Sequence, residues 1–503
     1  MPLRLLVAAA CGIILSAALP PTGFWPLALA LTPLYLLVAG SESSRRAFWL
    51  GFVFAAAFFT LYLLWLPLSF SVILSPAFWA LFPLLILILA AIWGGTTGLS
   101  RWLGGKGAGT LWLLPAAWVL VEWVRSQGYL GFPWGALGYL WLDTPVAQIA
   151  DLIGVYGLSL VTTMLAALFA MPFLPLGERS GHRPLYSLFT PVIPLALGAA
   201  LWGAGLARSD LPVAPPTETA LLIQGNVDPL GRMLSPSQEL SVHTDLTRNG
   251  QLDLATTPDL VVWPEGAVLG LTVDGVAGEP VREKIQQSAP HSTFIVGGRA
   301  HNGGRSFNSV YSIDEQLLDD RYDKVFLVPF GERWPLVETA APVYRAIFEL
   351  LGLPLLQSTS PGPAFDPLQT AAGPVAAYIC YESVFPQVQR AMVRRGATVL
   401  INITNDAWFA RGNGARQHFD MGRLRAIETR RYLLRAGNDG ITALVGPRGE
   451  VLAELERDAA GILKVDYGLS ETKTVWVRYG HLFIPLLTAY AVGAVALALL
   501  RRP

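Results

Sequence analysis

Apolar and polar residues are segregated along this chain of 503 residues. Residues 1–206 are almost entirely apolar, residues 207–480 mix apolar runs with charged ones as a soluble domain does, and residues 482–500 are apolar again. A helix that crosses a bilayer needs about 20 apolar residues. The pattern predicts eight membrane spans, at residues 4–19, 25–39, 48–66, 76–94, 111–125, 153–175, 186–206 and 482–500.

These spans divide the chain into three parts. We expect a membrane domain with seven transmembrane helices at 1–206, an extramembrane domain at 207–480, and a C-terminal transmembrane helix with a short cytoplasmic tail at 481–503. Basic residues near spans mark the cytoplasmic side of a membrane. They follow every second predicted span, whereas the loops at 20–24 and 67–75 carry no charge. The extramembrane domain is therefore predicted to lie outside the cytoplasm.

The composition narrows the class of protein further. Hydrophobic residues make up 53% of the chain and charged residues only 14%, whereas soluble domains carry about 25% charged residues. The 36 basic and 36 acidic residues cancel, so no basic surplus points to a nucleic-acid partner. The only two cysteines, Cys11 and Cys380, cannot form a disulfide framework. The six histidines show no metal-ligand spacing, and no metal or cofactor is predicted.

Short apolar runs alternate with helical patterns in the extramembrane domain, which predicts an α/β layered fold. The helical patterns include residues 280–287 and 421–434. Arginines crowd the second of these, and such a crowd is more often a solvated face than a buried one: Arg423, Arg425, Arg430, Arg431 and Arg435. The predicted strands are residues 220–223, 260–263, 293–296, 309–313, 375–379, 399–403 and 441–445.

Two charges end the predicted span at 111–125. Glu122 and Arg125 lie where charges are costly in lipid, which by itself suggests a function. The alternative is an interfacial pair that holds helix ends together, and the sequence favours neither. The apolar stretch 127–145 that follows is broken by glycine and proline, and we expect it to form a loop at the membrane surface.

Three reactive side chains follow strand-like runs in the extramembrane domain. Glu265 comes after the run 260–263, Lys324 lies within a further strand-like run, and Cys380 follows the run 375–379. A carboxylate can take the proton of a thiol, and an ammonium can stabilise the thiolate and then an oxyanion. Backbone N–H groups after Cys380 would add an oxyanion donor if the residue lies on a tight turn. Each residue alone also has an ordinary structural interpretation, and His418 remains an open second partner for Cys380.

These three residues and the motifs around them resemble those of the apolipoprotein N-acyltransferases, a membrane-embedded branch of the nitrilase superfamily. The resemblance covers nearly the full chain, including the arrangement of spans. After Trp-Pro-Glu the family usually has Ser, Thr or Ala, and this chain has Gly266. The motifs that carry the resemblance are Trp263-Pro264-Glu265, Tyr322-Asp323-Lys324, Val328-Pro329-Phe330-Gly331-Glu332, Cys380-Tyr381-Glu382, Gly131-Phe132-Pro133-Trp134, Gln224-Gly225-Asn226 and Asn405-Asp406-Ala407-Trp408-Phe409.

The resemblance implies a nitrilase-type αββα sandwich attached to a polytopic helical membrane domain. Cys380 would be the nucleophile, Glu265 the general base, and Lys324 the stabiliser of the tetrahedral intermediate. Supporting positions of the active site would be Glu332, Asn308, Tyr381 and Glu382.

The resemblance also implies a reaction with defined partners. Cys380 would take the sn-1 acyl chain of a phospholipid as a thioester, and the α-amine of an S-diacylglyceryl-cysteine at the N-terminus of an apolipoprotein would then receive it. No cofactor is implied. The enzyme would be a multi-pass protein of the bacterial inner membrane, with its catalytic domain in the periplasm.

Residues 334–357 are unusually apolar for a loop region of a soluble domain. An amphipathic arm that enters the membrane interface would bring lipid to the site. We expect Trp334, Phe348 and Trp408 to contact lipid or to belong to a lid, and residues 404–417 could form that lid. The alternative is that the apolar face of the arm packs against the protein.

Two other functions are compatible with parts of the sequence. A membrane-tethered carbon–nitrogen hydrolase would pass the acyl group to water, and the three reactive residues alone do not distinguish it from an acyltransferase. A non-enzymatic membrane scaffold would have lost at least one of the three, yet Glu265, Lys324 and Cys380 are all present.

Overall fold

The computed structural model describes residues 1–73, 76, 78–175, 192–228, 234–252, 254, 257–315, 320–351, 358–410 and 412–500. The chain forms two compact units. Unit 1 consists of Met1–Ser71, Pro76–Leu211 and Tyr479–Pro503, and unit 2 consists of Val72–Ser75 and Pro212–Arg478.

Every predicted span contains an apolar helix, but the structure does not confirm a count of eight spans. Over the described residues, four helices are long and apolar enough to cross a membrane, or five if the bent pair α3 and α4 is one span. The others are shorter. The helices are α1 (Pro2–Ser16), η1 (Trp25–Ala30), α2 (Leu31–Ala39), α3 (Ser44–Tyr62), α4 (Trp65–Ile73), α5 (Phe78–Gly104), α6 (Ala108–Val124), α7 (Ala150–Ala170), α9 (Val192–Ser209) and α16 (Phe483–Leu500).

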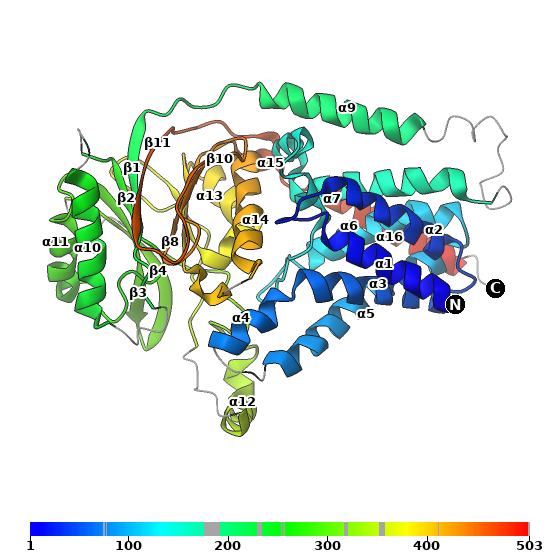
Figure 1. The fold of residues 1–503 in the computed structure, drawn as a ribbon, viewed down its shortest axis with the longest axis horizontal. Coiled ribbons are helices and arrows are strands. Elements are labelled where there is room, and N and C mark those ends of the chain that lie inside the picture. Colours follow the sequence, from blue (N-terminus) through cyan, green and yellow to red (C-terminus); the bar gives the residue numbers. More distant parts are fainter. Residues whose placement is uncertain are drawn as a thin grey trace. The chain divides into compact units, whose positions relative to one another are not determined.

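Small residues let three helices of unit 1 approach closely. Helices α1, α3 and α5 lie side by side (Figure 1). A side chain at Gly12 would collide with the Phe54 carbonyl group, and one at Gly51 would collide with Thr97 and the Trp93 carbonyl oxygen. Close helix contact through small residues is typical of membrane proteins, where van der Waals packing and hydrogen bonds drive association.

Glu122 and Arg125 hold the segment that follows α6. Glu122 Oε1 accepts hydrogen bonds from Trp118 Nε1 (2.9 Å) and the Leu137 N–H (3.1 Å). Arg125 donates to the carbonyl oxygens of Phe132 (2.8 Å) and Trp134 (3.0 Å). These contacts favour the structural interpretation of both charges.

In the segment at 127–145, residues 127–130 are exposed, whereas most of residues 131–145 are buried. Its expected place at the membrane surface stays a prediction. It contains the short 3-10 helix η2 (Leu137–Trp141), and η3 (Pro145–Ile149) follows. Trp134 is only 1% exposed, and every residue of η2 is buried.

Unit 2 contains two sheets with helices on their outer faces. The first has the strand order β11-β1-β2-β3-β4-β5 and the second β10-β9-β8-β7-β6. Helices α10 (Pro236–Leu252) and α11 (Glu279–Gln286) lie against the first sheet, and α13 (Pro386–Arg394) and α14 (Gly414–Thr429) against the second (Figure 1). The strands are β1 (Glu218–Gln224), β2 (Leu260–Val262), β3 (Thr293–Asn302), β4 (Arg305–Ile313), β5 (Asp320–Asp323), β6 (Ala376–Ile379), β7 (Leu400–Thr404), β8 (Leu433–Gly437), β9 (Ala443–Val445), β10 (Val451–Glu454) and β11 (Gly461–Tyr467).

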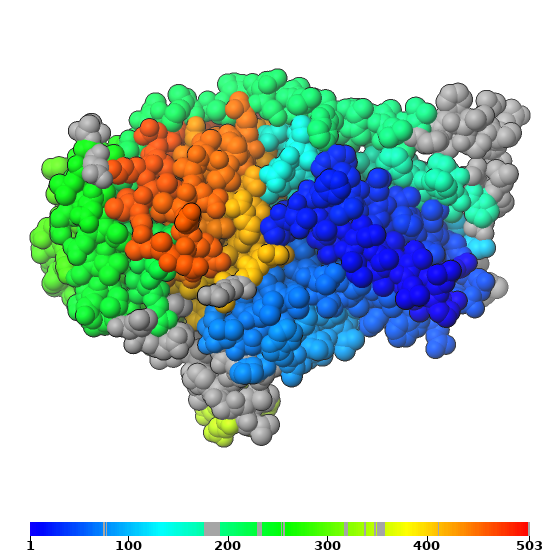
Figure 2. Space-filling view, viewed as in Figure 1, coloured from blue at the N-terminus to red at the C-terminus, as the bar shows by residue number. Residues whose placement is uncertain are grey.

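The two sheets face each other, which gives the layer order helix, sheet, sheet, helix. Parallel pairing joins β1 to β2 to β3 in one sheet and β6 to β7 to β8 in the other. The last strand, β11, returns to pair antiparallel with β1. The orange segment that carries β10 and β11 covers part of the surface of unit 2 (Figure 2).

All seven predicted strands are confirmed, and β5 lies at the start of the strand-like run around Lys324. Three more strands were not predicted: β8, β10 and β11. The predicted helix at 421–434 is wrong at its C-terminal end. Helix α14 stops at Thr429, Arg430 has a left-handed φ of 53°, and strand β8 begins at Leu433. The apolar run before Arg435 belongs to a buried strand, which helical periodicity cannot reveal.

The predicted solvated face of arginines is also wrong, because all five arginines are buried. Arg423 donates to the Gly449 carbonyl oxygen (2.9 Å), Arg431 donates to the Ala397 carbonyl oxygen (2.8 Å), and Arg435 donates to Asp406 Oδ2 (2.7 Å). A guanidinium presents five donors in a fixed plane, so it can satisfy several carbonyl groups at once inside a protein.

His243 on α10 predicts an acid sensitivity of unit 2. The side chain is 1% exposed and lies 2.9 Å through Nδ1 from the Glu239 carbonyl oxygen. Burial lowers the pKa of His243 from 6.5 to about 4. Below pH 6.5 the unfolded chain therefore binds a proton at His243 that the folded chain does not bind. Stability is lost as the pH falls from 6.5 toward 4, by up to about 3 kcal/mol.

We expect His243→Asn to reduce this loss, because asparagine can keep the contact to the Glu239 carbonyl oxygen and does not titrate. The measurement is the Tm of the detergent-solubilised protein at about pH 7.5 and about pH 5. The variant should show the smaller fall in Tm. An equal fall in both proteins would assign the acid sensitivity to other groups.

Candidate active site

Three strand ends bring the predicted reactive residues together in unit 2. Glu265 follows β2 and Lys324 follows β5 in the first sheet, whereas Cys380 follows β6 in the second. Lys324 Nζ lies 3.5 Å from Glu265 Oε1, and the charges of Glu265 and Lys324 both act on the Cys380 thiol. The site therefore lies between the two facing sheets, where each supplies part of it.

Lys324 is the buried cation of the site. Its side chain is 1% exposed, and Nζ lies 2.8 Å from Glu332 Oε2. Burial alone would lower the pKa of the Lys324 ammonium, but Glu332 and Glu265 more than offset burial and hold that pKa above its ordinary value. Lys324 therefore stays protonated throughout the physiological pH range.

Asn308 and the backbone order the two carboxylates. Asn308 Nδ2 donates to Glu265 Oε1 (2.8 Å) and to Glu332 Oε1 (2.7 Å). The Val328 N–H donates to Glu332 Oε2 (2.9 Å). Burial opposes ionisation of Glu332, yet Lys324 and these donors hold its pKa below the ordinary value. Glu332 is thus an ionised partner of the lysine.

Cys380 sits on a strained turn directly after β6. Its φ of 49° is in the left-handed region, which costs a residue with a Cβ about 1 kcal/mol. Burial and the Glu265 carboxylate raise the pKa of the Cys380 thiol, although Lys324 opposes them. The resting side chain is therefore a thiol, and a base must remove its proton when it reacts.

Glu265, the predicted base, is held at both carboxylate oxygens. Its Oε1 is held by Asn308, and its Oε2 accepts from the Asn405 N–H at 3.0 Å. Gly266, which departs from the family pattern, has a φ of 74°. Glycine adopts this conformation at little cost, so the departure suits the turn that carries Glu265.

Glu382 joins the turn after Lys324 to the turn at Cys380. Its side chain is fully buried. Oε1 accepts from Tyr322 Oη (2.7 Å), the Val325 N–H (2.8 Å) and the Phe326 N–H (3.2 Å), and Oε2 accepts from the Ile379 N–H (2.9 Å). One carboxylate thus links the two sheets at the site, and Glu382 acts as a positioning residue.

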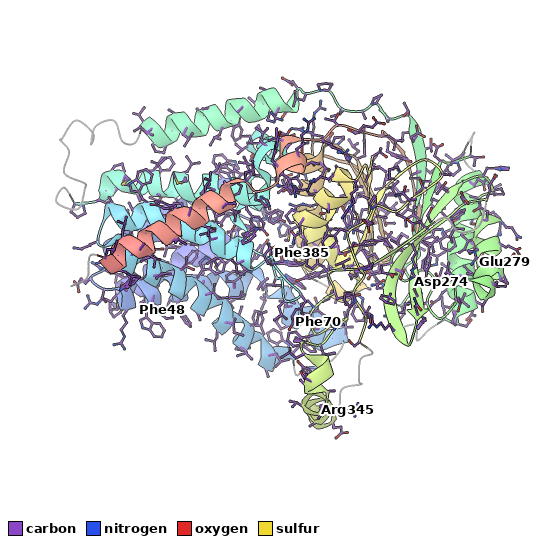
Figure 3. The ribbon with its side chains drawn as sticks, turned by 180° about the vertical axis from the view of Figure 1, so that it is seen from behind. Phe48, Phe70, Asp274, Glu279, Arg345 and Phe385 are labelled. Atoms are coloured by element: carbon purple, nitrogen blue, oxygen red, sulfur yellow. The ribbon has the colours of Figure 1, made fainter. Side chains whose placement is uncertain are left out.

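Tyr381 packs beside the site in an aromatic cluster. Its ring meets Phe385 edge-on at 5.0 Å between centroids, and Phe385 stacks on Phe326 at 4.3 Å. Phe385 lies next to the start of α13 (Figure 3). This cluster supports the turn η7 (Cys380–Val384) from the side of α13.

The three residues predicted to contact lipid lie in two separate segments of unit 2, and their contacts with protein do not test that role. Trp334 packs on Phe330 (5.4 Å) and Tyr344 (5.1 Å) near α12 (Val337–Leu351). Trp408 is half-buried in the short helix η8 (Asp406–Phe409). The side chain of Phe348 lies outside the described residues. These three assignments stay predictions.

Sequence reasoning missed most of a buried polar cluster behind Cys380. His418 Nε2 lies 3.0 Å from the Cys380 carbonyl oxygen and 2.8 Å from Ser383 Oγ. Its Nδ1 lies 3.3 Å from Asp406 Oδ1 and 3.2 Å from an Arg435 nitrogen. His418 thus contacts the backbone of Cys380. The signals in the sequence were the Asn-Asp motif at 405–406 and His418 as an open partner for Cys380, and in the structure His418 contacts the Cys380 carbonyl oxygen.

The arrangement supports acyl transfer by a thiol. It combines the Cys380 thiol, the Glu265 carboxylate and the Lys324 ammonium in a buried place, where charges interact strongly. Within the described part of the chain, no group of three or more histidine, cysteine or acidic residues could hold a metal ion.

Comparison with protein families matches both units. Residues 11–168 match the model described as "Apolipoprotein N-acyltransferase N-terminal domain", and residues 253–475 match the model described as "Carbon-nitrogen hydrolase". The second match covers Glu265, Lys324 and Cys380 and supports a nitrilase-type fold for unit 2.

Full-length relatives extend these matches. Proteins named apolipoprotein N-acyltransferase match from Allorhizobium ampelinum (33% identity, 98% of this chain and 96% of the relative), Geobacter metallireducens (31%, 99% and 95%) and Vibrio cholerae (29%, 98% and 96%). Among solved structures, an amidase from Nesterenkonia sp. matches 54% of this chain and 96% of its own at 19% identity, with a TM-score of 0.39. The assignment therefore rests on the full-length relatives: this chain belongs to the apolipoprotein N-acyltransferase family and is an acyltransferase.

Proposed function

We propose that this enzyme transfers an acyl chain from the sn-1 position of a membrane phospholipid to the α-amine of the S-diacylglyceryl-cysteine of an apolipoprotein. The acyl chain passes through a thioester on Cys380. The enzyme acts in the bacterial inner membrane, with unit 1, which includes α16, in the bilayer and unit 2 on the periplasmic side. The membrane domain ends near residue 206, and the catalytic domain covers residues 207–480.

In the first half-reaction Glu265 takes the proton of the Cys380 thiol as Sγ attacks the sn-1 ester carbonyl carbon. A C–S bond forms, and the carbonyl π electrons move to oxygen. The Lys324 ammonium stabilises this oxyanion. When the intermediate collapses, the ester C–O bond breaks, and Glu265 returns its proton to the leaving lysophospholipid oxygen.

In the second half-reaction the neutral α-amine attacks the thioester carbonyl carbon. A C–N bond forms, and Glu265 takes the amine proton. Collapse breaks the C–S bond, and Glu265 returns the proton to the departing Cys380 sulfur. The product is the N-acylated lipoprotein, and the enzyme is regenerated unchanged.

The observation that carries this proposal is the contact between Lys324 and two carboxylates in a buried site that also contains Cys380. The two carboxylates divide the work. Glu332, at 2.8 Å, holds the lysine, and Glu265, at 3.5 Å, remains available to move protons. The described residues include four apolar helices long enough to cross a membrane, and such helices would anchor the enzyme in lipid.

The arm around α12 supports a lipid acyl donor. Leu336 is 66% exposed and Val343 is 59% exposed. Helix α12, marked by Arg345 in Figure 3, stands away from the sheets of unit 2. Exposed apolar side chains on a helix favour insertion at the surface of a bilayer. Trp334, Phe348 and Trp408 are proposed to contact the incoming acyl chain.

The test is intact mass spectrometry of the Cys11→Ser variant, in which Cys380 is the only cysteine. After incubation with phosphatidylethanolamine vesicles, we expect a mass increase of one fatty acyl group. Hydroxylamine should remove it, because hydroxylamine cleaves thioesters. The lysophospholipid should appear in equal amount.

Two outcomes would contradict the proposal. Intact phospholipid and an unmodified protein would remove the acyl-enzyme. Release of free fatty acid, with no transfer when a diacylated cysteinyl peptide is added, would instead favour a carbon–nitrogen hydrolase type of reaction that passes the acyl group to water.

A further inference from the structure

A buried polar cluster lies behind Cys380 and takes no part in the proton transfers described above. It consists of Asp406, His418 and Arg435, with Ser383 at its edge, and each of these residues is at most 1% exposed. Arg435 on β8 binds both Asp406 oxygens, at 3.0 and 2.7 Å. His418 on α14 connects this ion pair to the backbone of Cys380.

The partners of His418 determine where its ring proton lies. Burial lowers the pKa of His418, and Arg435 adds to this effect while Asp406 opposes it, so the ring is neutral. The Cys380 carbonyl oxygen can only accept a hydrogen bond, and the Arg435 guanidinium can only donate one. A proton on Nε2 suits the three shorter contacts, because Nε2 then faces the Cys380 carbonyl oxygen (3.0 Å) and Ser383 Oγ (2.8 Å), and Nδ1 accepts from Arg435 (3.2 Å). The longest contact, from Nδ1 to Asp406 Oδ1 (3.3 Å), then carries no hydrogen. The geometry therefore favours the proton on Nε2.

The Cys380 carbonyl group is one half of a rigid peptide unit. A peptide bond is planar and trans, so the carbonyl oxygen of Cys380 and the N–H of Tyr381 point in opposite directions. A hydrogen bond that fixes the carbonyl oxygen on the side of His418 turns the Tyr381 N–H away from His418. The left-handed φ of 49° at Cys380 needs such a restraint, because few residues with a Cβ adopt this conformation.

We propose that His418 is a positioning residue that donates from Nε2 to the Cys380 carbonyl oxygen and thereby aims the Tyr381 N–H at the oxyanion formed during acyl transfer. This inference rests on the proposed thioester route. Arg435 favours the tautomer that can donate to Cys380 because it donates toward Nδ1, and Asp406 holds Arg435 in place through both carboxylate oxygens. Glu382 fixes the Ile379 N–H before the turn, and His418 fixes the carbonyl group within it.

Two variants that differ by one methylene group test this role. The amide nitrogen of His418→Gln can reach the place of Nε2 and donate to Cys380, whereas the shorter amide of His418→Asn reaches only the place of Nδ1. In the Cys11→Ser background we expect His418→Asn to acylate Cys380 about 100-fold more slowly than the parent, as for loss of one oxyanion donor. His418→Gln should stay within about tenfold of the parent.

Alkylation of Cys380 by iodoacetamide separates positioning from a general loss of structure. This reaction needs the thiolate but forms no oxyanion. We expect both His418 variants to be alkylated at a rate within about threefold of the parent. His243→Asn is the matched control, because His243 is equally buried and also contacts a backbone carbonyl oxygen. It should acylate Cys380 at the parental rate.

The outcomes separate this inference from the proposed function. Equal acylation rates for His418→Asn, His418→Gln and the parent would overturn the role of His418 and leave the thioester route intact. A parallel loss of acylation and alkylation in His418→Asn would also overturn it, because the thiol itself would then be misplaced. Failure of the parent to form an acyl-enzyme would instead remove the proposed function.

Discussion

Replacement of Cys380 by alanine is expected to lower acyl transfer by at least about 10⁴-fold, because no other group in the site can form the thioester. The substitution removes one sulfur atom from a buried turn and keeps the Cβ. We therefore expect the free energy of unfolding to change by no more than about 1 kcal/mol. The measurement is the rate of transfer from phosphatidylethanolamine to a diacylated cysteinyl peptide in detergent micelles, together with the Tm.

Cys11→Ser is the control for this experiment. Cys11 is also buried, but it lies on α1 in unit 1. It should keep the parental rate of transfer. Transfer by Cys380→Ala within about tenfold of the parent would show that the acyl chain does not pass through this thiol, and direct attack of the amine on the phospholipid ester would become the better mechanism.

Replacement of Lys324 by methionine is expected to have the second-largest effect, on both activity and stability. It leaves Glu265 and Glu332 in one buried site, bridged by Asn308, without their cation. Removal of one partner of a buried ion pair costs about 3–5 kcal/mol. The oxyanion also loses its stabilising charge, so transfer should fall by at least about 10³-fold.

A double-mutant cycle separates the two roles of Lys324. The variant Lys324→Met with Glu332→Gln removes the ion pair as a whole and leaves Glu265 as the only carboxylate beside Asn308. We expect it to recover most of the lost stability, measured as Tm, and to remain inactive. Recovery of activity together with stability would show that the lysine acts only by holding the fold.

The acid dependence of stability is expected to have more than one source. The pKa of Glu332 is held below its ordinary value by Lys324. The stability that this pair contributes is therefore present above the unfolded pKa of glutamate and is lost as the pH falls through the folded value. This loss occurs at lower pH than the loss caused by His243, so the two contributions separate along a pH series.

The sequence by itself determined the strands that carry the chemistry. Runs such as 375–379 and 399–403 are almost entirely apolar because their strands are buried on both faces, and this signal is local. The reactive side chains at or near the ends of such runs therefore indicated Glu265, Lys324 and Cys380 as candidates. The family motifs added Asn308, Glu332 and Glu382, whose hydrogen-bond partners lie in other parts of the chain.

The number of membrane spans was less well determined. Hydropathy registers apolar length, and each predicted span does contain an apolar helix. However, α1, the segment 25–39 and α6 are shorter than a full crossing, and α3 and α4 are separated by a bend of 47°. Local hydropathy cannot tell a helix that spans the bilayer from one that is buried within the protein.

Only the tertiary structure decided which polar residues are buried and what they hold. The arginines at 423–435 are typical of a solvated face when the sequence is considered alone, yet Arg435 pairs with Asp406 in the interior. His418 contacts the carbonyl group of a residue 38 positions away, and Glu382 accepts hydrogen bonds from β5 and the segment after it, 56 to 60 positions away. A charge can be buried only where the fold supplies it with partners. Those partners come from elements far apart in the sequence, so the local pattern of residues does not reveal them.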